Sequence, residues 1–128
     1  MTGTVCALRR HPIKAHGRET LTHVDLTVGQ TIPWDRTWAV ALDRAKIEDG
    51  VWSACGNFHR AAKNPALMAL TSQTDDEGRI TVAHPDLYPL TFDPATEGQA
   101  FIDWLSPLVP AEGARPARLI SAGSRGMT

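Results

Sequence analysis

Cysteine is scarce in this sequence, and the cysteines present are not spaced as metal ligands. The chain has two, Cys6 and Cys55, which form neither a CxxC motif nor another metal-ligand spacing. We interpret them as free thiols of a cytosolic protein, with a disulfide between them as the alternative. Long apolar runs are also missing. Residues 1–10 hold none of signal-peptide length, and no segment approaches the ~20 apolar residues of a membrane span. These absences predict a cytoplasmic location and no membrane segment.

Neither an excess of one charge nor a high aromatic content is present. The net charge is -1 and aromatic residues make up 6% of the sequence, which weighs against nucleic acid or an anionic membrane as the partner. A nucleic-acid-binding barrel is the weakest alternative, because such barrels stack bases on exposed aromatic rings along a basic groove. The chain contains no Rossmann fingerprint, P-loop or GxSxG motif, and we assign it no catalytic residue. Its length of 128 residues suits one domain with a hydrophobic core.

The sequence does contain alternating apolar and polar residues, which are typical of β-strands. The expected strands cover residues 4–11, 24–28, 38–42, 67–70, 80–82, 90–92 and 117–121. A turn signal at residues 75–78 predicts that the strands at 67–70 and 80–82 form a hairpin. In the first strand Cys6 and Leu8 are expected to face inward, so that Cys6 is a buried, inert thiol. Cys55 is expected to be more exposed.

One segment has helical periodicity instead. Its apolar residues are spaced i, i+3, i+4 and i+7, which predicts an amphipathic helix, and they are Phe101, Trp104, Leu105 and Leu108. Thr96 and Gln99 have the form of a capping box at its start, and Pro107 is expected to end it. Together with the strands, this pattern predicts a mainly β protein: a small, mostly antiparallel β-barrel with one flanking α-helix.

Two short segments carry cations where strands are expected to end or begin. Residues 11–17 (HPIKAHG), here called the lysine loop, place Lys14 after Pro12, which ends the first strand because proline cannot donate to a ladder. Residues 34–38 (WDRTW), here called the arginine loop, place Arg36 where the chain enters another strand. A lysine and an arginine at one rim of the barrel suit phosphate oxygens. The alternatives are a solvated surface role for Lys14 and an ion pair of Arg36 with Asp35 or Asp43.

The spacing of these two loops carries a family resemblance. Residues 8–38 resemble the start of MOSC N-terminal β-barrel domains, in which a Y-P-I/V-K-S motif precedes a G-x-x-x-D-R-x-W block. Here the first motif reads HPIKA and the second occupies residues 29–38, while residues 64–70 resemble the family's P-x-M/L-A-x-I segment. The closing residues 126–128 resemble the start of the MOSC domain proper. The resemblance implies a MOSC N-terminal-like β-barrel domain over residues 1–122. Residues 123–128 would then be a linker toward a C-terminal MOSC domain that the sequence lacks.

The resemblance also implies that this domain helps to bind the molybdenum cofactor, molybdopterin. In the family, the lysine and serine of the first motif and the arginine of the second reach the cofactor's phosphate. These positions are Lys14, Ala15 and Arg36 here, so a hydroxyl donor is missing at Ala15, and His11 replaces the usual tyrosine. The family's metal-ligating cysteine belongs to the C-terminal MOSC domain, and neither cysteine of this chain matches it. The resemblance thus implies no metal ligand here, and cofactor binding only together with the C-terminal domain.

Two reactions are implied, and the sequence does not decide between them. One is oxidoreduction of N-hydroxylated compounds, with an electron-transfer protein as partner. The other is sulfur transfer, with a sulfur-donor protein as partner. In either case the chemistry belongs to the cofactor and the missing domain, so this chain alone is not expected to be an enzyme. The alternative is a non-enzymatic β-barrel module that binds a partner protein or an anionic metabolite.

The histidines invite a separate interpretation. His11, His16 and His23 are close in sequence, but their spacing fits no metal-ligand pair on a helix or a strand. His59 and Arg60 lie near the end of a long aperiodic stretch. Because long loops in compact domains are often functional, contact with a substrate and a solvated position both remain open for these two residues.

Overall fold

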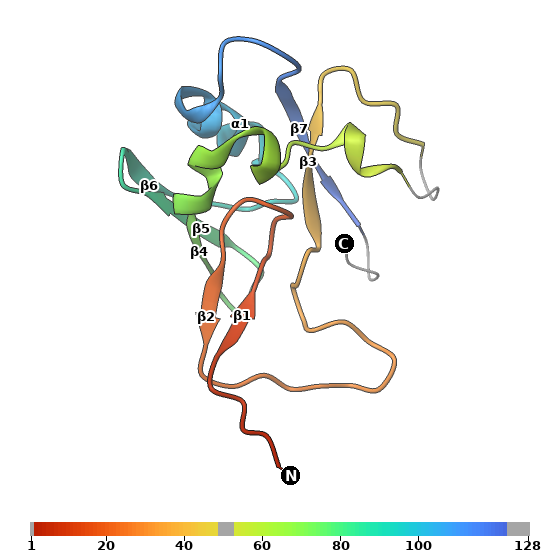
Figure 1. Ribbon diagram of the computed structural model, residues 1–128, viewed down its shortest axis with the longest axis vertical. Helices are drawn as coiled ribbons and strands as arrows, with labels where there is room; N and C mark the ends of the chain where they lie inside the picture. Colours follow the sequence, from red (N-terminus) through yellow and green to blue (C-terminus); the bar gives the residue numbers. More distant parts are fainter. Residues whose placement is uncertain (1, 49–52, 123–128) are drawn as a thin grey trace.

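A computed structural model describes residues 2–48 and 53–122, and the predicted linker at 123–128 lies outside them. The strands are β1 (Leu8–Arg10), β2 (Glu19–Leu21), β3 (Trp38–Leu42), β4 (Thr71–Thr74), β5 (Ile80–His84), β6 (Leu87–Phe92) and β7 (Pro116–Ser121). The α-helix α1 spans Gly98–Leu105, and short 3-10 turns are η1 (Cys55–Asn57), η2 (Ala61–Lys63), η3 (Pro65–Ala69) and η4 (Ser106–Leu108). Figure 1 shows how these elements are arranged.

The strands pair antiparallel in three small sheets, β1–β2, β3–β7 and β4–β5–β6. Isolated bridges connect them, because Ile13 lies beside Trp38 of β3 and Arg18 lies beside Thr71 of β4. The loop between β1 and β2 therefore joins the other two sheets (Figure 1). The predicted mainly β fold with antiparallel strands and one α-helix is confirmed.

Helix α1 completes the enclosure that the strands leave open. It packs against both β6 and β7, which lie at opposite ends of this series of sheets. Within the part of the chain described, the strands do not hydrogen-bond into a closed ring. The helix thus flanks a barrel-like enclosure and takes the place of the missing strand pairing.

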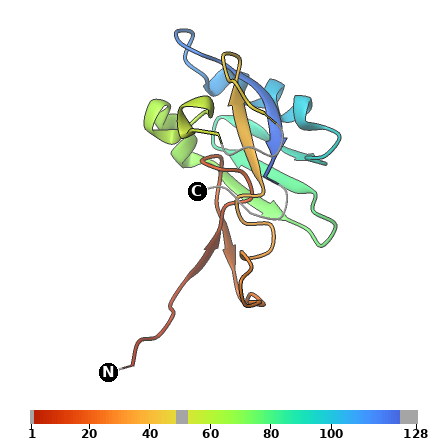
Figure 2. The ribbon, with the colours of Figure 1, turned by 90° about the vertical axis from the view of Figure 1, so that its right-hand side faces the viewer.

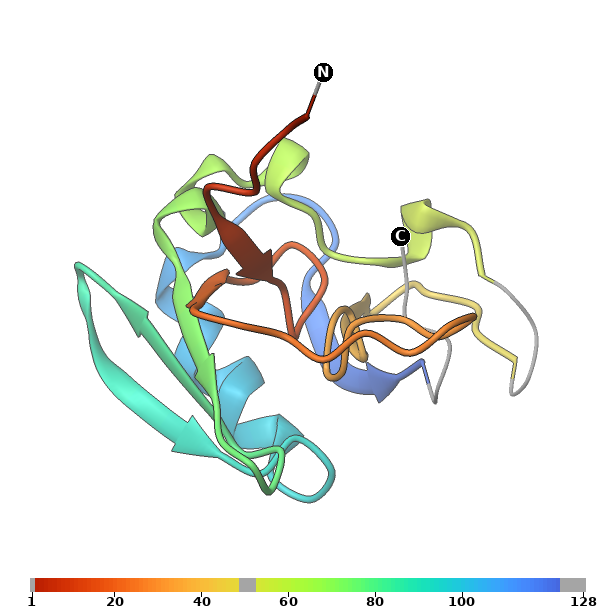
Figure 3. The same cartoon turned by 90° about the horizontal axis from the view of Figure 1, so that it is seen from below.

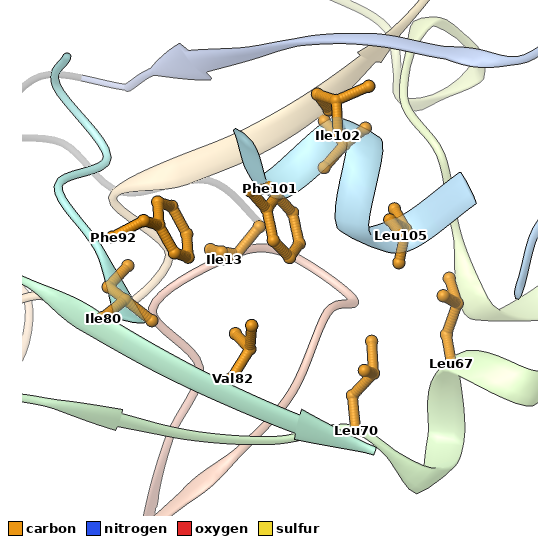
Figure 4. Close-up of a cluster of buried hydrophobic side chains, with 10 residues drawn as sticks. Ile13, Leu67, Leu70, Ile80, Val82, Phe92, Phe101, Ile102 and Leu105 are labelled. Carbon is orange, nitrogen blue, oxygen red and sulfur yellow. The ribbon is translucent and has the colours of Figure 1, made fainter. Parts of the chain in front are cut away.

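The hydrophobic core lies between α1 and the sheets, as Figure 4 shows. Phe92 of β6 and Phe101 of α1 stack there with ring centroids 5.1 Å apart. Ile13 of the lysine loop is fully buried in the same cluster. Because burial of one such side chain stabilises the fold by ~1.5–3 kcal/mol, Ile13 fixes the lysine loop to the core.

Strand β3 confirms the prediction made from its alternation, and both of its faces are covered. Ala39, Val40 and Ala41 are completely buried. Besides β7, this strand has Ile13 as a neighbour at Trp38 and Phe58 as a neighbour at Ala41. The two small alanines leave room for these close neighbours. The arginine loop therefore leads directly into the most buried strand.

The turn at residues 75–78 is confirmed, but one strand of the hairpin lies later than predicted. Asp75 Oδ1 accepts the backbone N–H groups of Glu77 and Arg79, both at 2.9 Å, and the turn joins β4 to β5. Residues 67–70 are not a strand, because 67–69 belong to η3 and Leu70 follows it. Leu67 and Leu70 are three residues apart and both buried in the core, which suits a 3-10 turn better than a strand.

The predicted helix is confirmed as α1, whereas the predicted capping box is wrong. The N-cap residue is Glu97, and no side chain caps the helix. Glu97 instead accepts the backbone N–H of Asp93 at 2.9 Å, which closes the turn before the helix. Among residues 2–48 and 53–122, no helix is long and apolar enough to cross a bilayer.

Two predicted strands near the N-terminus are wrong in extent or in kind. Residues 24–28 form no strand, and Leu26 is 76% exposed in a loop that runs outside the β1–β2 hairpin (Figure 3). The first strand is limited to β1, because β2 pairs only with Leu8–Arg10. The preceding residues extend away from the body of the molecule (Figure 2), so Cys6 is exposed and not buried as predicted. Alternation alone does not make a strand where no partner strand is available.

Candidate functional site

The lysine loop and the arginine loop lie side by side, held by backbone hydrogen bonds. The N–H of Lys14 donates to the Trp38 carbonyl at 2.8 Å, and the N–H of Trp38 donates to the Pro12 carbonyl at 3.1 Å. At the other end, the N–H of Arg36 donates to the His11 carbonyl. Ile13 and Trp38 form a parallel bridge between the two loops. The backbones of the predicted site residues Lys14, Ala15 and Arg36 therefore belong to two adjoining segments.

Backbone strain is concentrated in these two loops. Within residues 2–48 and 53–122, the non-glycine residues with a positive φ are Ala15 (66°), Trp34 (66°) and Arg36 (46°). Left-handed backbone costs a residue with a Cβ about 1–2 kcal/mol, so tertiary contacts must hold it in place. One such contact is the Trp34 ring, which lies over the β4–β5 turn so closely that a Cβ at Gly78 would be 2.8 Å from it. Strain of this kind is typical of functional loops.

The carboxylate of Asp35 links both loops. Its Oδ1 accepts the backbone N–H of His11 at 2.9 Å, and its Oδ2 lies 2.5 Å from Nη1 of Arg36. The ion pair that the sequence offered as one role of Arg36 is thus present with Asp35. A guanidinium has five N–H donors. Since the Arg36 side chain is 41% exposed, it keeps donors for a further anion.

Charged groups from three positions act on His11, which lies in the lysine loop. Burial lowers the pKa of His11, and the positive charge of Arg36 lowers it further. The Asp35 carboxylate raises that pKa, whereas Arg18 lowers it. Two cations, Arg36 and Arg18, therefore act on His11 against the carboxylate of Asp35. Lys14, on the same loop as His11, carries a further ammonium group. This donor set of guanidinium and ammonium groups fits a phosphate.

A buried pair of histidines lies directly behind Lys14, and sequence reasoning missed it. His16 Nδ1 lies 2.8 Å from the Lys14 carbonyl oxygen, and His16 Nε2 lies 2.9 Å from His59 Nδ1. On the far side, Asn64 Nδ2 lies 3.5 Å from His59 Nε2 and 2.9 Å from the Leu108 carbonyl oxygen. We call His16 and His59 the buried histidine pair. They come from segments far apart in sequence, so no local pattern indicates their contact.

These hydrogen bonds define one arrangement of protons. A carbonyl only accepts, so His16 must carry its proton on Nδ1, which leaves Nε2 as an acceptor. His59 must then donate from Nδ1 and accept at Nε2 from the Asn64 amide, which also donates to Leu108. Both histidines are neutral in this arrangement, and each ring nitrogen has a partner.

Burial explains why the pair stays neutral. His16 is 0% exposed, and burial lowers its pKa from 6.5 to about 3, although the hydrogen bond to Lys14 acts in the opposite direction. Burial also lowers the pKa of His59. His59 is therefore not in a solvated loop, and that interpretation from the sequence is wrong. The neighbouring Phe58, an aromatic residue that pairs with Ala41 of β3, could have indicated that His59 is buried.

The remaining candidates do not gather into a site. Cys6 and Cys55 are both free and exposed, which confirms the prediction of two thiols. Nη1 of Arg60 lies 3.4 Å from the sulfur of Cys55. Across the described residues, no three His, Cys, Asp or Glu side chains are grouped so that they could hold a metal ion.

Comparison with known proteins supports the family resemblance. The profile of the MOSC N-terminal beta barrel domain matches residues 2–106, which include the lysine loop and the arginine loop. No curated protein and no solved structure shows significant similarity to the chain. Because the match extends over most of the 128 residues and over both cation-bearing loops, the chain belongs to the MOSC N-terminal beta barrel domain family.

Proposed function

We propose that this domain forms one wall of a molybdenum-cofactor cleft, in which Lys14 and Arg36 bind the phosphate of molybdopterin. The observation that carries the proposal is the direct backbone pairing of the two loops, at Lys14 with Trp38 and at Arg36 with His11. This pairing brings the backbone segments that carry the two cations next to each other. The strained backbone at Ala15 and Arg36 also supports a binding role for the two loops, because such strain is typical of functional sites.

Each residue has a separate part in phosphate binding. Arg36 donates from the guanidinium nitrogens that Asp35 leaves open, and Lys14 adds a compact positive charge. Ala15 carries no hydroxyl, so the contribution of a serine at this position is absent. An Ala15→Ser substitution adds that donor in a loop already held in left-handed backbone, and we expect it to strengthen phosphate binding.

The chemistry itself is assigned to the cofactor and to a C-terminal MOSC domain. When bound, the cofactor supplies the metal for oxidoreduction of N-hydroxylated compounds or for sulfur transfer. This domain contributes binding and orientation of the cofactor, with the C-terminal MOSC domain as its partner. An electron-transfer protein or a sulfur-donor protein completes either reaction. Two exposed free thiols suit the reducing cytoplasm, which we propose as the location.

A titration of the chain with inorganic phosphate, followed by NMR, tests the proposal. We expect weak binding, with amide shifts in residues 11–17 and 34–38, that is reduced in Lys14→Ala and Arg36→Ala. Arg79→Ala is the matched control, because Arg79 is also paired with an acid and its side chain is 42% exposed, close to the 41% of Arg36. If all three variants bind phosphate as the parent chain does, the phosphate site is not at these loops.

A non-enzymatic binding module remains the second candidate. It is favoured by the exposed apolar side chains of Leu26 and Val28 on the loop before the arginine loop, since exposed apolar groups often mark contacts with a protein partner. The phosphate titration separates the candidates in part. Leu26→Ser together with Val28→Ser should leave phosphate binding unchanged if Lys14 and Arg36 form the site.

A further inference from the structure

The backbone of Lys14 is held on both sides. Its N–H donates to the Trp38 carbonyl at 2.8 Å, and its C=O accepts from Nδ1 of His16, also at 2.8 Å. A second contact tightens the same loop, because the N–H of His16 donates to the Ile13 carbonyl at 3.1 Å. The orientation of the Lys14 backbone therefore depends on Trp38 on one side and His16 on the other.

His16 is fixed in turn by groups from three other parts of the chain. His59 holds its Nε2, the ring of Phe101 on α1 lies edge-on at 6.0 Å, and Asn64 connects His59 to η4 through the Leu108 carbonyl. The N–H of His59 donates to the Val40 carbonyl of β3 at 2.9 Å. The chain of contacts thus runs from the core strand and η4 to the Lys14 carbonyl.

A buried polar pair is not the simplest way to fill this space. Burying imidazoles costs free energy, and well-packed apolar side chains of similar volume are often neutral or stabilising in such a place. Two histidines whose ring nitrogens are all partnered do what apolar residues cannot, since they hold a carbonyl group at a defined position. We propose that His16 and His59 are positioning residues that set the orientation of Lys14, and that protonation of this pair releases the anion-binding loop. This inference rests on the proposed function of Lys14.

Protonation disrupts the pair because only one proton arrangement satisfies it. A proton added to His16 Nε2 would face the Nδ1–H of His59 across 2.9 Å, and a proton added to His59 Nε2 would face the Asn64 amide. Of the titratable side chains in the described part of the chain, His59 is the one that acts on His16, and no carboxylate there offsets a positive charge on the pair. Lys14 presents its carbonyl to His16, Asn64 presents its amide to His59, and the neighbouring Arg60 contacts Cys55.

The experiment compares the chain with a variant in which both histidines are apolar, His16→Leu with His59→Leu. Amide hydrogen exchange of Lys14 by NMR reports the loop directly, and the phosphate titration reports the site. Loss of the hydrogen bond to the Lys14 carbonyl should speed exchange of the Lys14 amide by about fivefold and weaken phosphate binding by a similar factor. In the parent chain, the exchange rate of the Lys14 amide relative to its intrinsic rate should rise as the pH falls below 6.5. This rise should be absent from the double variant.

Two further variants separate positioning from stability. His16→Asn keeps a side-chain N–H donor near the Lys14 carbonyl, and we expect it to restore part of the protection. His84→Leu is the control, because His84 is also buried and bonds a carbonyl, that of Ala66 at 3.2 Å, on a different element. We expect exchange at Lys14 in His84→Leu to match that of the parent chain.

The possible outcomes distinguish this inference from the proposed function. Unchanged Lys14 exchange in the double variant would overturn the positioning role. Faster exchange with unchanged phosphate binding, when Lys14→Ala does weaken binding, would show that the pair does not serve the anion site. If Lys14→Ala itself leaves phosphate binding unchanged, the proposed function fails, while faster exchange in the double variant still supports the hold of the pair on the Lys14 backbone.

Discussion

Asp35 and Arg36 are neighbours in sequence whose side chains form an ion pair, with Asp35 Oδ2 2.5 Å from Nη1 of Arg36. The same carboxylate accepts the backbone N–H of His11, so both loops meet at Asp35. His11 is therefore a local probe of the field that an incoming anion would meet.

Substitutions of the two partners should shift the pKa of His11 in opposite directions. Asp35→Asn removes the charge that raises this pKa and should lower it, whereas Arg36→Ala removes a charge that lowers it and should raise it. The imidazole chemical shifts followed by NMR over pH give both values. Arg79→Ala is the control and should leave the His11 pKa unchanged. Shifts of the same sign in Asp35→Asn and Arg36→Ala would mean that the loops are not arranged as described.

Cofactor retention should depend on both cations in a protein that carries this domain together with the C-terminal MOSC domain. Lys14→Ala and Arg36→Ala each remove charged hydrogen bonds, and each should weaken retention by ~1.5–3 kcal/mol. Molybdenum and pterin content after native purification, compared at equal protein concentration, measures the effect. Full cofactor content in both variants would exclude the phosphate-binding role.

Acid should destabilise the fold through the buried histidine pair. The pKa of His16 is about 3 in the folded protein and 6.5 when the chain is unfolded, so its contribution is complete above pH 6.5 and declines as the pH falls toward 3. Each pH unit within this window costs ~1.4 kcal/mol, or ~2 kcal/mol between pH 6.5 and pH 5. Burial lowers the pKa of His59 too, which adds to the loss in the same direction.

Urea unfolding at pH 7.5 and pH 5 measures this dependence. The variant with leucine substituted for both His16 and His59 should lose most of it, while His84→Leu should retain it. A parent chain that is equally stable at both pH values would show that the pair is not held neutral by burial.

Among the acidic side chains with described partners, we expect Glu19 to contribute most to the free energy of unfolding. It is buried and accepts from Arg10 Nε at 3.0 Å, from the Thr74 N–H at 3.0 Å and from the Thr74 hydroxyl at 2.9 Å. Glu19→Gln breaks a buried ion pair and should cost about 3 kcal/mol in the free energy of unfolding. Thermal or urea unfolding measures the loss.

Glu97→Gln is the matched control for that substitution. Glu97 pairs with Arg79 at 3.6 Å, and the two side chains are 48% and 42% exposed. Exposed pairs of this kind contribute about 0–1 kcal/mol, so this variant should stay close to the parent in stability. Equal losses in Glu19→Gln and Glu97→Gln would contradict the role of burial.

Two predictions from local spacing, helix α1 and the turn at residues 75–78, were confirmed, whereas the capping box of Thr96 and Gln99 was wrong. The apolar spacing of Phe101, Trp104 and Leu105 placed α1, because a helix brings residues three and four apart onto one face. The turn at residues 75–78 needed only Asp75 and a glycine able to adopt a φ of +87°, both of which are local features. The predictions that failed, the strands at 24–28 and 67–70 and the burial of Cys6, required a partner strand or a covered face.

The amino-acid sequence by itself determined the mainly β class, the position of the helix, and the two cation-bearing motifs that mark the family. Tertiary structure alone decided that these motifs pair through Lys14 and Trp38, and that His16 meets His59 behind them. The physical reason is the distance along the chain over which each kind of interaction acts. Periodicity and turn chemistry act over a few residues, whereas burial and hydrogen-bond partners come from segments that only the folded chain brings together.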